Sequence, residues 1–346
     1  MIIDANMYYI PEELFEDEEL LKKFIEEIPV EDGWYGYCQE IPDMNGLKQI
    51  VLEKPKGYQN LNYAQHDYIL EKQLADMDAA GVDAAFLKMP CCQEWMSLDM
   101  CRYFNDHMTE HAKKSQGRLI PMAVVPPFGT TENIEELVRC HDKLGMKAVQ
   151  LSAHYGDAYL DDERFEGFFA KMNELGLTGY VHHTPVPVEY GTFYEYNNVR
   201  RSYGRCVDQG LAIGRELFGG LFEKYPNIKL VHSMLGGGFF AISNMMFPKK
   251  AKKETVSRFQ SDNGQMAEMF RNHIYFEMSH AQPWGKEQLE CAIKVLGADH
   301  IFFGTSYPVR KEWLLEGVQF VNELDITEEE KRLILGENAQ RLYLAE

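Results

Sequence analysis

The chain has 346 residues, of which 45% are hydrophobic, and a formal net charge of −19. The apolar content is sufficient for a large core, and the negative charge argues against nucleic acid or an anionic membrane surface as the main partner. The sequence contains no apolar run near the roughly 18 residues of a membrane span, and its N-terminus lacks the order of a signal peptide. The seven cysteines form no C-x-x-C pair, so we expect free thiols in a cytoplasmic protein without a membrane partner.

The first predicted element is a short strand within residues 1–11. Ile2 and Ile3 are apolar, and Pro11 prevents a helix from beginning at once. Residues 10–65 follow as an insertion that is too long for a plain connection. Its first part is acidic and predicts a helix, whereas its second part is irregular and rich in aromatic residues. We interpret the insertion as a functional loop or a small subdomain that caps the rest of the chain.

Helical periods and short apolar strands alternate through the remainder of the sequence. Gly81 is expected to end the first of these helices, and Thr327 with Glu330 is expected to form a capping box for the C-terminal helix. The strands predicted after the first are residues 82–87, 119–125, 146–151, 177–183, 228–233, 273–279 and 300–306.

These strands and helices form about eight units, which predict a single (β/α)8 TIM barrel over residues 1–346 with an insertion after strand 1 and a C-terminal helix. An open doubly wound sheet is the alternative, but no Gly-x-Gly-x-x-Gly sequence follows a strand. In such a barrel, the chemistry is placed where the strands end at the C-terminal face. The polar residues at these ends are Asn6 and Tyr8, Lys88, Ser152 with His154, His182 with His183, His232, Glu277 with His280, and Ser306.

Six motifs along the chain resemble one known family. They are GVDAAF, GMKAVQL, GYVHHTP, YPNIKLVHSMLGGG, IFFGTSYP and GENAQRLY. In this order, they resemble the amidohydrolase-related group that contains the metal-dependent aminocarboxymuconate semialdehyde and resorcylate decarboxylases. The resemblance implies a TIM barrel that acts on a small aromatic or unsaturated carboxylic acid by decarboxylation or hydrolysis. Together with the general frequency of two-fold oligomers, it also favours a homodimer.

The resemblance further implies where a metal would be held. The family's histidine ligands on the fifth and sixth strands match His182 and His232. Its first-strand histidines fall on Asn6 and Tyr8, and its catalytic carboxylate falls on Ser306. Because a catalytic zinc ion generally needs three protein ligands, two histidines form only a weak site. We therefore expect no tightly bound cofactor, although a weakly held zinc or manganese ion is compatible with His182 and His232.

A reaction without a metal would depend on the same strand ends. His182, His232 and Tyr8, with His183 in the same pocket, could give or take protons at cellular pH. Ser306 would take part only if a neighbouring group activates it. One alternative is a non-catalytic binding protein in which the substituted residues merely fill an emptied site. Another is a metal-dependent enzyme in which His183, His154, His280 or Glu277 completes the metal shell.

Two loops are expected to hold the substrate. Residues 184–205 follow the fifth strand and contain three arginines, whose guanidinium groups bind carboxylates through paired hydrogen bonds. Aromatic rings in this loop, among them Tyr190 and Tyr194, offer flat faces, as does a tryptophan in the insertion. The alternative is a loop that packs on itself or on a partner subunit. The predicted substrate-binding residues are Asn6, Trp34, His183, Arg200, Arg201 and Arg205.

Overall fold

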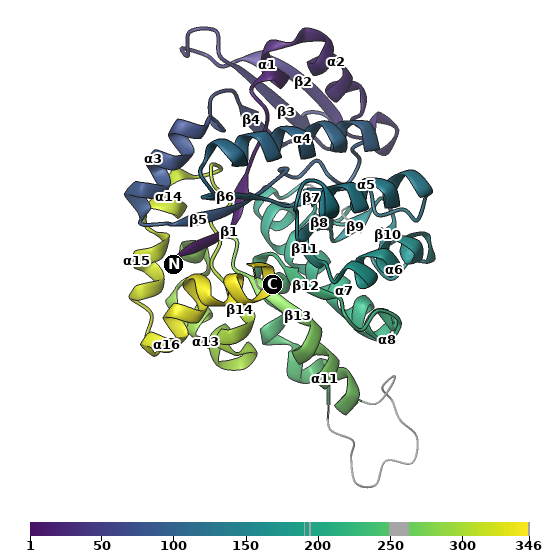
Figure 1. Ribbon diagram of the computed structural model, residues 1–346, viewed down its shortest axis with the longest axis vertical. Helices are drawn as coiled ribbons and strands as arrows, with labels where there is room; N and C mark the ends of the chain where they lie inside the picture. Colours follow the sequence, from purple (N-terminus) through teal and green to yellow (C-terminus); the bar gives the residue numbers. More distant parts are fainter. Residues whose placement is uncertain (190, 194, 249–262, 345–346) are drawn as a thin grey trace.

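The computed structural model describes residues 1–189, 191–193, 195–248 and 263–344, which leaves Tyr190 and Tyr194 of the predicted substrate loop outside the described residues. Within these ranges, parallel strands follow one another around a barrel (Figure 1). In order they are β1 (Ile3–Tyr8), β5 (Ala84–Lys88), β6 (Leu119–Pro121) continued by β7 (Ala123–Val124), β8 (Ala148–Ser152), β11 (Thr178–His182), β12 (Lys229–His232), β13 (Ile274–Glu277) and β14 (Ile301–Phe302). The eight predicted strands are thereby confirmed.

Backbone hydrogen bonds outside the regular ladders join these strands into one ring. β1, β5 and β6 pair in one parallel group, and β7, β8 and β11 to β14 pair in a second. On one side of the ring, Met122 N donates to Leu87 O at 2.9 Å. On the other side, Tyr8 N donates to Tyr307 O at 2.8 Å. β1 therefore lies between β5 and the segment after β14, as a closed (β/α)8 barrel requires.

One buried apolar cluster fills the interior of the barrel, and a larger one lies between the strands and the helices. The inner cluster consists of Ile3, Ala5, Ala84, Phe86, Met122, Ala148, Tyr180, Val231, Phe302, Ala339 and Tyr343. The ring of Tyr343, from the C-terminal segment, lies 4.7 Å from that of Phe86 and 5.8 Å from that of Phe302 between centroids. This segment therefore closes the barrel on the side opposite the polar strand ends.

Helices cover the outer face of the barrel (Figure 1). Gly81 ends α3 with a φ of 70°, and Thr327 and Glu330 form the capping box of α16, both as predicted. No helix in the described ranges is long and apolar enough to cross a membrane. The longer helices are α3 (Leu70–Ala80), α4 (Leu98–Lys114), α5 (Thr131–Asp142), α6 (Glu166–Leu175), α7 (Arg205–Phe218), α11 (Asn263–His273) and α13 (Lys286–Leu296). The shorter ones are η2 (Glu163–Phe165), η3 (Val199–Gly204), α8 (Leu221–Lys224), α9 (Met234–Gly238), η4 (Phe239–Ala241), α10 (Ser243–Met246), α12 (Ala281–Trp284), η5 (Ala298–His300), α14 (Lys311–Leu315), α15 (Gly317–Asn322), α16 (Glu328–Arg332), η6 (Leu333–Glu337) and η7 (Gln340–Leu344).

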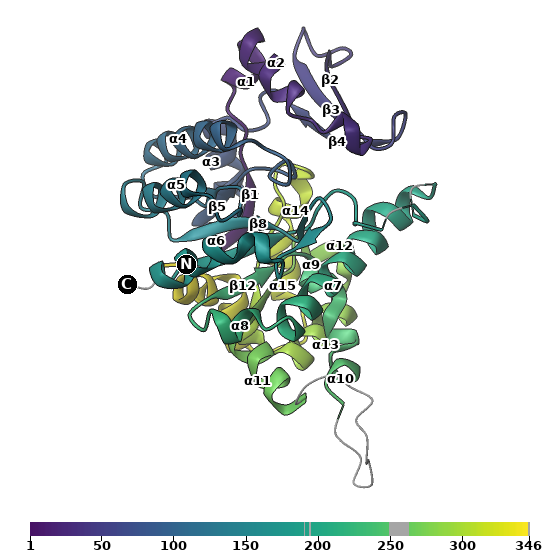
Figure 2. The ribbon, with the colours of Figure 1, turned by 90° about the vertical axis from the view of Figure 1, so that its right-hand side faces the viewer.

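The insertion after β1 forms a small unit, which we call the cap. It contains α1 (Glu13–Glu16), α2 (Glu18–Glu26), η1 (Val30–Asp32) and an antiparallel sheet of β2 (Tyr35–Glu40), β3 (Lys48–Glu53) and β4 (Gln59–Ala64). The expected acidic helix is present in two pieces, because Asp17 ends α1 and its side chain caps α2. The stretch that we expected to be irregular is instead a three-stranded sheet. Figure 2 shows the cap at one end of the molecule.

Candidate active site

Polar side chains from several strands meet inside the mouth of the barrel. Tyr8 is paired with Lys88 across β1 and β5. Side chains alternate between the two faces of a strand, so residues two positions apart point the same way. Phe86 and Tyr180 belong to the cluster inside the barrel, and Lys88 and His182, two residues later on the same strands, therefore also point inward. All three polar side chains are buried. The mouth thus contains a phenol, an amine and an imidazole, and the alternation within β5 is the sequence signal that would have placed the amine there.

A tyrosine–histidine pair is the best defined contact of this mouth. Tyr8 Oη lies 2.7 Å from His182 Nε2, and His182 Nδ1 lies 2.6 Å from the backbone oxygen of His183. Because a carbonyl oxygen only accepts, Nδ1 carries the proton, and Nε2 accepts the hydrogen bond from the Tyr8 hydroxyl. Burial lowers the pKa of His182 well below its usual value, and the charge of Lys88 lowers it further. Burial raises the pKa of Tyr8. The structure therefore brings these predicted residues together as a neutral pair.

A buried carboxylate, which we predicted only as a replacement metal ligand and not as a catalytic or substrate-binding residue, lies in the same mouth. Glu277, the last residue of β13, accepts hydrogen bonds from Asn6 Nδ2 at 3.0 Å and from Tyr180 Oη at 2.6 Å. The backbone N–H of Ser279 donates to its other oxygen. Burial raises the pKa of Glu277 to about 7, although the charge of Lys88 and the Tyr180 hydrogen bond oppose the rise. Glu277 is therefore a group that can change its charge near neutral pH.

Asn6 and Ser306 lie next to this carboxylate. Asn6 Nδ2 lies 3.1 Å from Ser306 Oγ, and Ser306 Oγ in turn lies 3.3 Å from the backbone oxygen of Ser279. A Cβ atom on Gly304 would overlap Glu277 Oε1, so glycine is needed for Glu277 to approach β14. These contacts are neutral hydrogen bonds, and none of them would make Ser306 a nucleophile. Both residues thus act here as partners that hold Glu277 and its surroundings.

The three predicted arginines occupy different positions. Arg205, at the start of α7, is buried, and its Nε donates to Pro185 O at 3.1 Å. Its Nη2 donates to Asn60 Oδ1 of the cap, also at 3.1 Å. Arg200 is also buried and donates to Asn197 of its own loop at 2.9 Å and to the backbone oxygen of Gln59 in the cap at 3.4 Å, whereas Arg201 is exposed. Arg205 is therefore the arginine that reaches from the loop toward the barrel.

The charge of Arg205 lies close to the tyrosine–histidine pair. Burial raises the pKa of Cys91 and of Tyr8, and the Arg205 guanidinium opposes both rises. Among the residues that the structure describes, Arg205 has only neutral hydrogen-bond partners and no carboxylate. A positive charge is thus buried at the mouth without a negative charge bonded to it.

His232 does not join this site, contrary to our prediction. On β12, His232 is paired with Val181 of β11. Val181 belongs to the larger apolar cluster, which lies between the strands and the helices. His232 Nδ1 lies 2.8 Å from Gln209 Oε1, and Nε2 lies 2.8 Å from Glu216 Oε2, both on α7. Successive side chains along a strand point to opposite faces of the sheet. At its position on β12, the His232 imidazole points away from the barrel interior, toward α7. His232 therefore fastens α7 to the barrel and does not face a substrate.

The metal site that the family resemblance implies does not fit this geometry. Of the two predicted histidine ligands, only His182 faces the mouth, because His232 is bonded to α7. Asn6 and Ser306 are hydrogen-bonded to each other, and both are neutral. One imidazole cannot hold a catalytic metal by itself. We therefore derive no catalytic step from a metal at the implied position.

A different group of ligand atoms could accept a metal ion. Cys91, His182 and His183 place one ligand atom each within 4.8 Å of one another. Cys91 Sγ lies 4.0 Å from His182 Nε2 and 3.9 Å from His183 Nε2. A thiolate with two imidazoles suits zinc better than manganese. Two features oppose a cation here, since Tyr8 is bonded to Nε2 of His182 and the charge of Arg205 lies nearby.

A cavity of about 510 Å³ lies between the cap and the barrel loops. Trp34 lines it, and the Trp34 ring lies 4.8 Å from that of Trp95. His154, also in the lining, has Nε2 3.3 Å from Asp208 Oδ2 and Nδ1 3.6 Å from Glu94 Oε1. Burial disfavours the charged form of His154, but the two carboxylates outweigh this effect and raise its pKa to about 9. Trp34, which we predicted as a substrate-binding residue, thus lines a cavity that also contains charged side chains.

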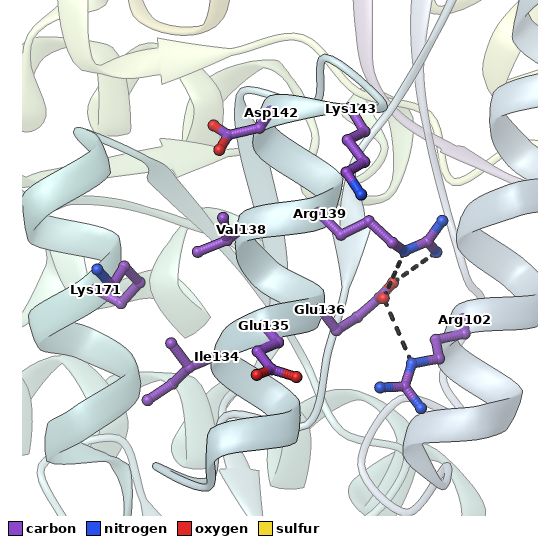
Figure 3. Close-up of a pocket in the computed structure, with 9 residues that line it drawn as sticks. All are labelled: Arg102, Ile134, Glu135, Glu136, Val138, Arg139, Asp142, Lys143 and Lys171. Atoms are coloured by element: carbon purple, nitrogen blue, oxygen red, sulfur yellow. Dashed lines mark hydrogen bonds and ion pairs between the residues drawn. The ribbon is translucent and has the colours of Figure 1, made fainter.

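A second hollow, of about 450 Å³, lies on the outer helices beside α5 (Figure 3). Glu136 is buried there and forms ion pairs with Arg139 at 2.7 Å and Arg102 at 3.5 Å. Arg139 also pairs with Asp106 and Arg102 with Asp99, so each arginine has a carboxylate partner besides Glu136. None of the predicted site residues lines the hollow. We assign it no role in the chemistry.

The His154 cluster predicts how stability depends on pH. Because the folded state holds a proton that the unfolded state releases near pH 6.5, the stabilisation is complete below pH 6.5 and disappears as the pH rises through about 9. It amounts to about 3 kcal/mol. The free energy of unfolding by urea should therefore fall over this range, and His154→Gln should flatten the slope. The exposed His66→Gln variant is the control, and an unchanged slope in His154→Gln would contradict the assignment.

The new position of His232 also leads to a prediction. His232→Leu should lower the free energy of unfolding by roughly 3–5 kcal/mol, because Glu216 would remain buried without its partner. The double variant His232→Leu/Glu216→Leu should recover much of this loss, since a buried pair can be replaced by apolar side chains. Urea titrations of the three proteins measure both effects. A stable single variant that merely loses activity would favour our original placement at the mouth.

Similarity to characterised proteins agrees with this architecture. The family model described as "Amidohydrolase" matches residues 77–344, well over half of the chain. The 2-amino-3-carboxymuconate-6-semialdehyde decarboxylase of Dictyostelium discoideum is 25% identical over 244 residues, which cover 70% of this chain and 66% of that enzyme, slightly less than two thirds of it. The gamma-resorcylate decarboxylase of Polaromonas sp. JS666 is 23% identical over 290 residues, 80% of this chain and 87% of that enzyme.

Solved structures share the fold over the full length. The 5-carboxyvanillate decarboxylase from Sphingomonas paucimobilis has a TM-score of 0.74 at 18% identity, with 100% of this chain and 99% of that chain covered. The enzyme of the same name from Novosphingobium aromaticivorans, in complex with manganese, has a TM-score of 0.76 at 18% identity and covers 100% and 96%. The family match and the barrel lead to one conclusion: the chain belongs to the amidohydrolase family.

Proposed function

We propose that this protein decarboxylates a small aromatic or unsaturated carboxylic acid at the mouth of the barrel. Two curated relatives support the reaction, since both are named as decarboxylases. Their names favour decarboxylation over the hydrolysis that was also expected. The substrate class includes acids that carry an aldehyde, because one relative is named for a carboxymuconate semialdehyde.

The observation that carries this proposal is the buried guanidinium of Arg205. A buried charge without a charged partner costs several kcal/mol unless a ligand compensates for it. The planar guanidinium group matches a carboxylate better than any other side chain. Arg205 has neutral partners among the described residues, and its charge reaches Tyr8 and Cys91. A substrate carboxylate at this position would complete the charge balance of the mouth.

The tyrosine–histidine pair would then supply the proton. In the reaction, the bond between the carbon skeleton and the carboxylate breaks, carbon dioxide leaves, and the electron pair stays on the former carboxyl-bearing carbon. Tyr8, whose hydroxyl is held by His182 at 2.7 Å, would protonate this carbon and recover a proton from solvent. His183, whose ring stacks on His182 at 4.2 Å, is a proposed substrate contact. One proton is consumed and one carbon dioxide is released in each turnover.

We further propose that the reaction needs no tightly bound metal. The implied ligand set is broken at His232, and the remaining group around Cys91 lies next to the charge of Arg205. This proposal departs from the manganese that is present in the Novosphingobium structure. The cytoplasmic location and the homodimer stay predictions from the sequence. The non-catalytic alternative would bind the same acids through Arg205 without releasing carbon dioxide.

Replacement of Arg205 tests the proposed carboxylate site. Arg205→Met should lower kcat/KM by roughly 10–100-fold, because a hydrogen-bonded charge contributes about 1.5–3 kcal/mol. The exposed Arg201→Met variant should stay within about 2-fold, since a surface charge at a distance contributes little. Carbon dioxide release is measured with 2-amino-3-carboxymuconate-6-semialdehyde, which carries an aldehyde, and with gamma-resorcylate, which carries none. Equal activity of both variants would show that Arg205 does not bind the substrate carboxylate. Binding of an acid without release of carbon dioxide would favour the non-catalytic alternative.

Metal analysis tests the second part of the proposal. Protein purified without chelators or a metal-binding tag should contain far less than one zinc or manganese per chain, and EDTA should leave its activity unchanged. Elemental analysis and the same assay measure both. Stoichiometric zinc that disappears in Cys91→Ser and in His183→Gln would contradict the metal-free reaction. Such a result would instead place the metal on Cys91, His182 and His183.

A further inference from the structure

Lys88 is a buried amine that has no hydrogen-bond partner among the described residues. It ends β5 with its side chain directed into the barrel and a relative exposure of 0%. Across the described ranges of the chain, no oxygen or nitrogen atom forms a hydrogen bond with its Nζ. An ammonium group has three donors, and leaving all of them unpaired in a dry interior is costly. This position is therefore unfavourable for a lysine that serves only as a structural cation.

The surroundings of Lys88 are mostly aromatic. Its Nζ lies 3.6 Å from the centroid of the Tyr180 ring and 5.3 Å from that of the Tyr8 ring. Glu277 is close enough to influence Lys88, but its oxygens are taken by the donors of Asn6, Tyr180 and Ser279. The nitrogen thus lies between ring faces, with a proton-exchanging carboxyl group nearby.

These surroundings favour the neutral amine. Burial lowers the pKa of Lys88 to about 7, and the negative charges of Glu277 and Asp4 prevent a larger fall. A lysine with an ordinary pKa near 10.4 is almost entirely protonated at pH 7, whereas a desolvated lysine presents a free lone pair. The neutral amine attacks aldehyde and ketone carbons and forms imines with them.

We propose that Lys88 forms an imine with an aldehyde or keto group of the substrate, and that this imine accepts the electron pair released on decarboxylation. The inference rests on the proposed function and narrows it to acids whose carbonyl group is placed β to the carboxylate or is joined to that position through double bonds. Arg205 would hold the carboxylate while Lys88 holds the carbonyl carbon. The imine would do what a metal ion does when it serves as an electron acceptor.

The chemistry balances without an added oxidant or reductant. The Nζ lone pair forms a bond to the carbonyl carbon, and the carbonyl oxygen leaves as water, with Glu277 as a proton donor. The bond to the carboxylate then breaks, carbon dioxide leaves, and the electron pair moves into the protonated C=N bond to give an enamine. Tyr8 returns a proton to carbon. Water hydrolyses the resulting protonated imine, which releases the product and restores the amine. The proton that this step frees, together with one proton from solvent, restores Glu277 and Tyr8.

Reductive trapping on the wild-type protein tests the imine directly. The protein is incubated at pH 7 with sodium cyanoborohydride and either succinic semialdehyde or 2-formylbenzoate, two stable acids that carry an aldehyde. Peptide mass spectrometry should find one adduct per chain on Lys88. Its labelling rate should exceed that of any exposed lysine on the order of 10³-fold, because so few ordinary lysines are neutral at this pH. Labelling spread over surface lysines with Lys88 unmodified would overturn the proposal.

Two variants separate the imine from a simple charge effect. Lys88→Arg keeps a positive charge but cannot form the imine, and Lys88→Met removes both the charge and the amine. Lys311→Arg at the surface is the control. Both Lys88 variants should lose the adduct and decarboxylase activity, with their folding checked by circular dichroism. Decarboxylation that persists in Lys88→Arg would overturn the imine and leave the proposed function intact. An adduct on Lys88 without release of carbon dioxide from any acid would support the imine and contradict the decarboxylase.

Discussion

The burial of an amine and a carboxyl group against the same side chain, Tyr180, is the constraint on which the rest of the site depends. The face of this ring lies against the Lys88 nitrogen, and its hydroxyl donates to Glu277. One rigid side chain thereby contacts the amine through its ring face and the carboxyl group through its hydroxyl group. Asn6 and Gly304 matter because they let the carboxylate stay where this arrangement requires it. The apolar layer beneath the mouth keeps water away, so each of these contacts is stronger than it would be at the surface.

The sequence alone was sufficient to predict the barrel, but it was not sufficient to predict the three-stranded sheet of the cap. The barrel strands are continuous apolar runs, because a parallel strand covered on both faces needs no polar alternation. The cap strands β2 and β4 are largely polar and partly exposed, and their pairing with β3 was not visible in composition. An antiparallel hairpin depends on its partner strand for stability, and that partner cannot be identified from one segment alone.

The position of a site residue could be predicted where the residue lies at the end of an apolar strand and the alternation of side chains shows which face of the strand it occupies. Tyr8 and His182 met as expected, because both strands end at the same side of the barrel. His232 failed because our prediction used its place at the end of a strand and ignored which face of that strand it occupies. Cys91 follows β5 in a turn, and nothing in its neighbourhood along the chain indicates that it approaches His182. Loop residues acquire their positions from packing across the whole molecule, which a linear pattern does not contain.

The contact between Asn6 and Ser306 joins residues that are 300 positions apart in the chain. Loop closure over such a distance is slow and entropically costly, so contacts of this kind form late in folding. During synthesis, β1 precedes β14 and cannot complete its pairing until Phe303 and Tyr307, just after β14, have followed. The half-built barrel therefore exposes an open strand edge and an apolar interior for most of translation. A protein of this design depends on rapid completion of the chain, or on chaperones that cover the edge, to avoid aggregation.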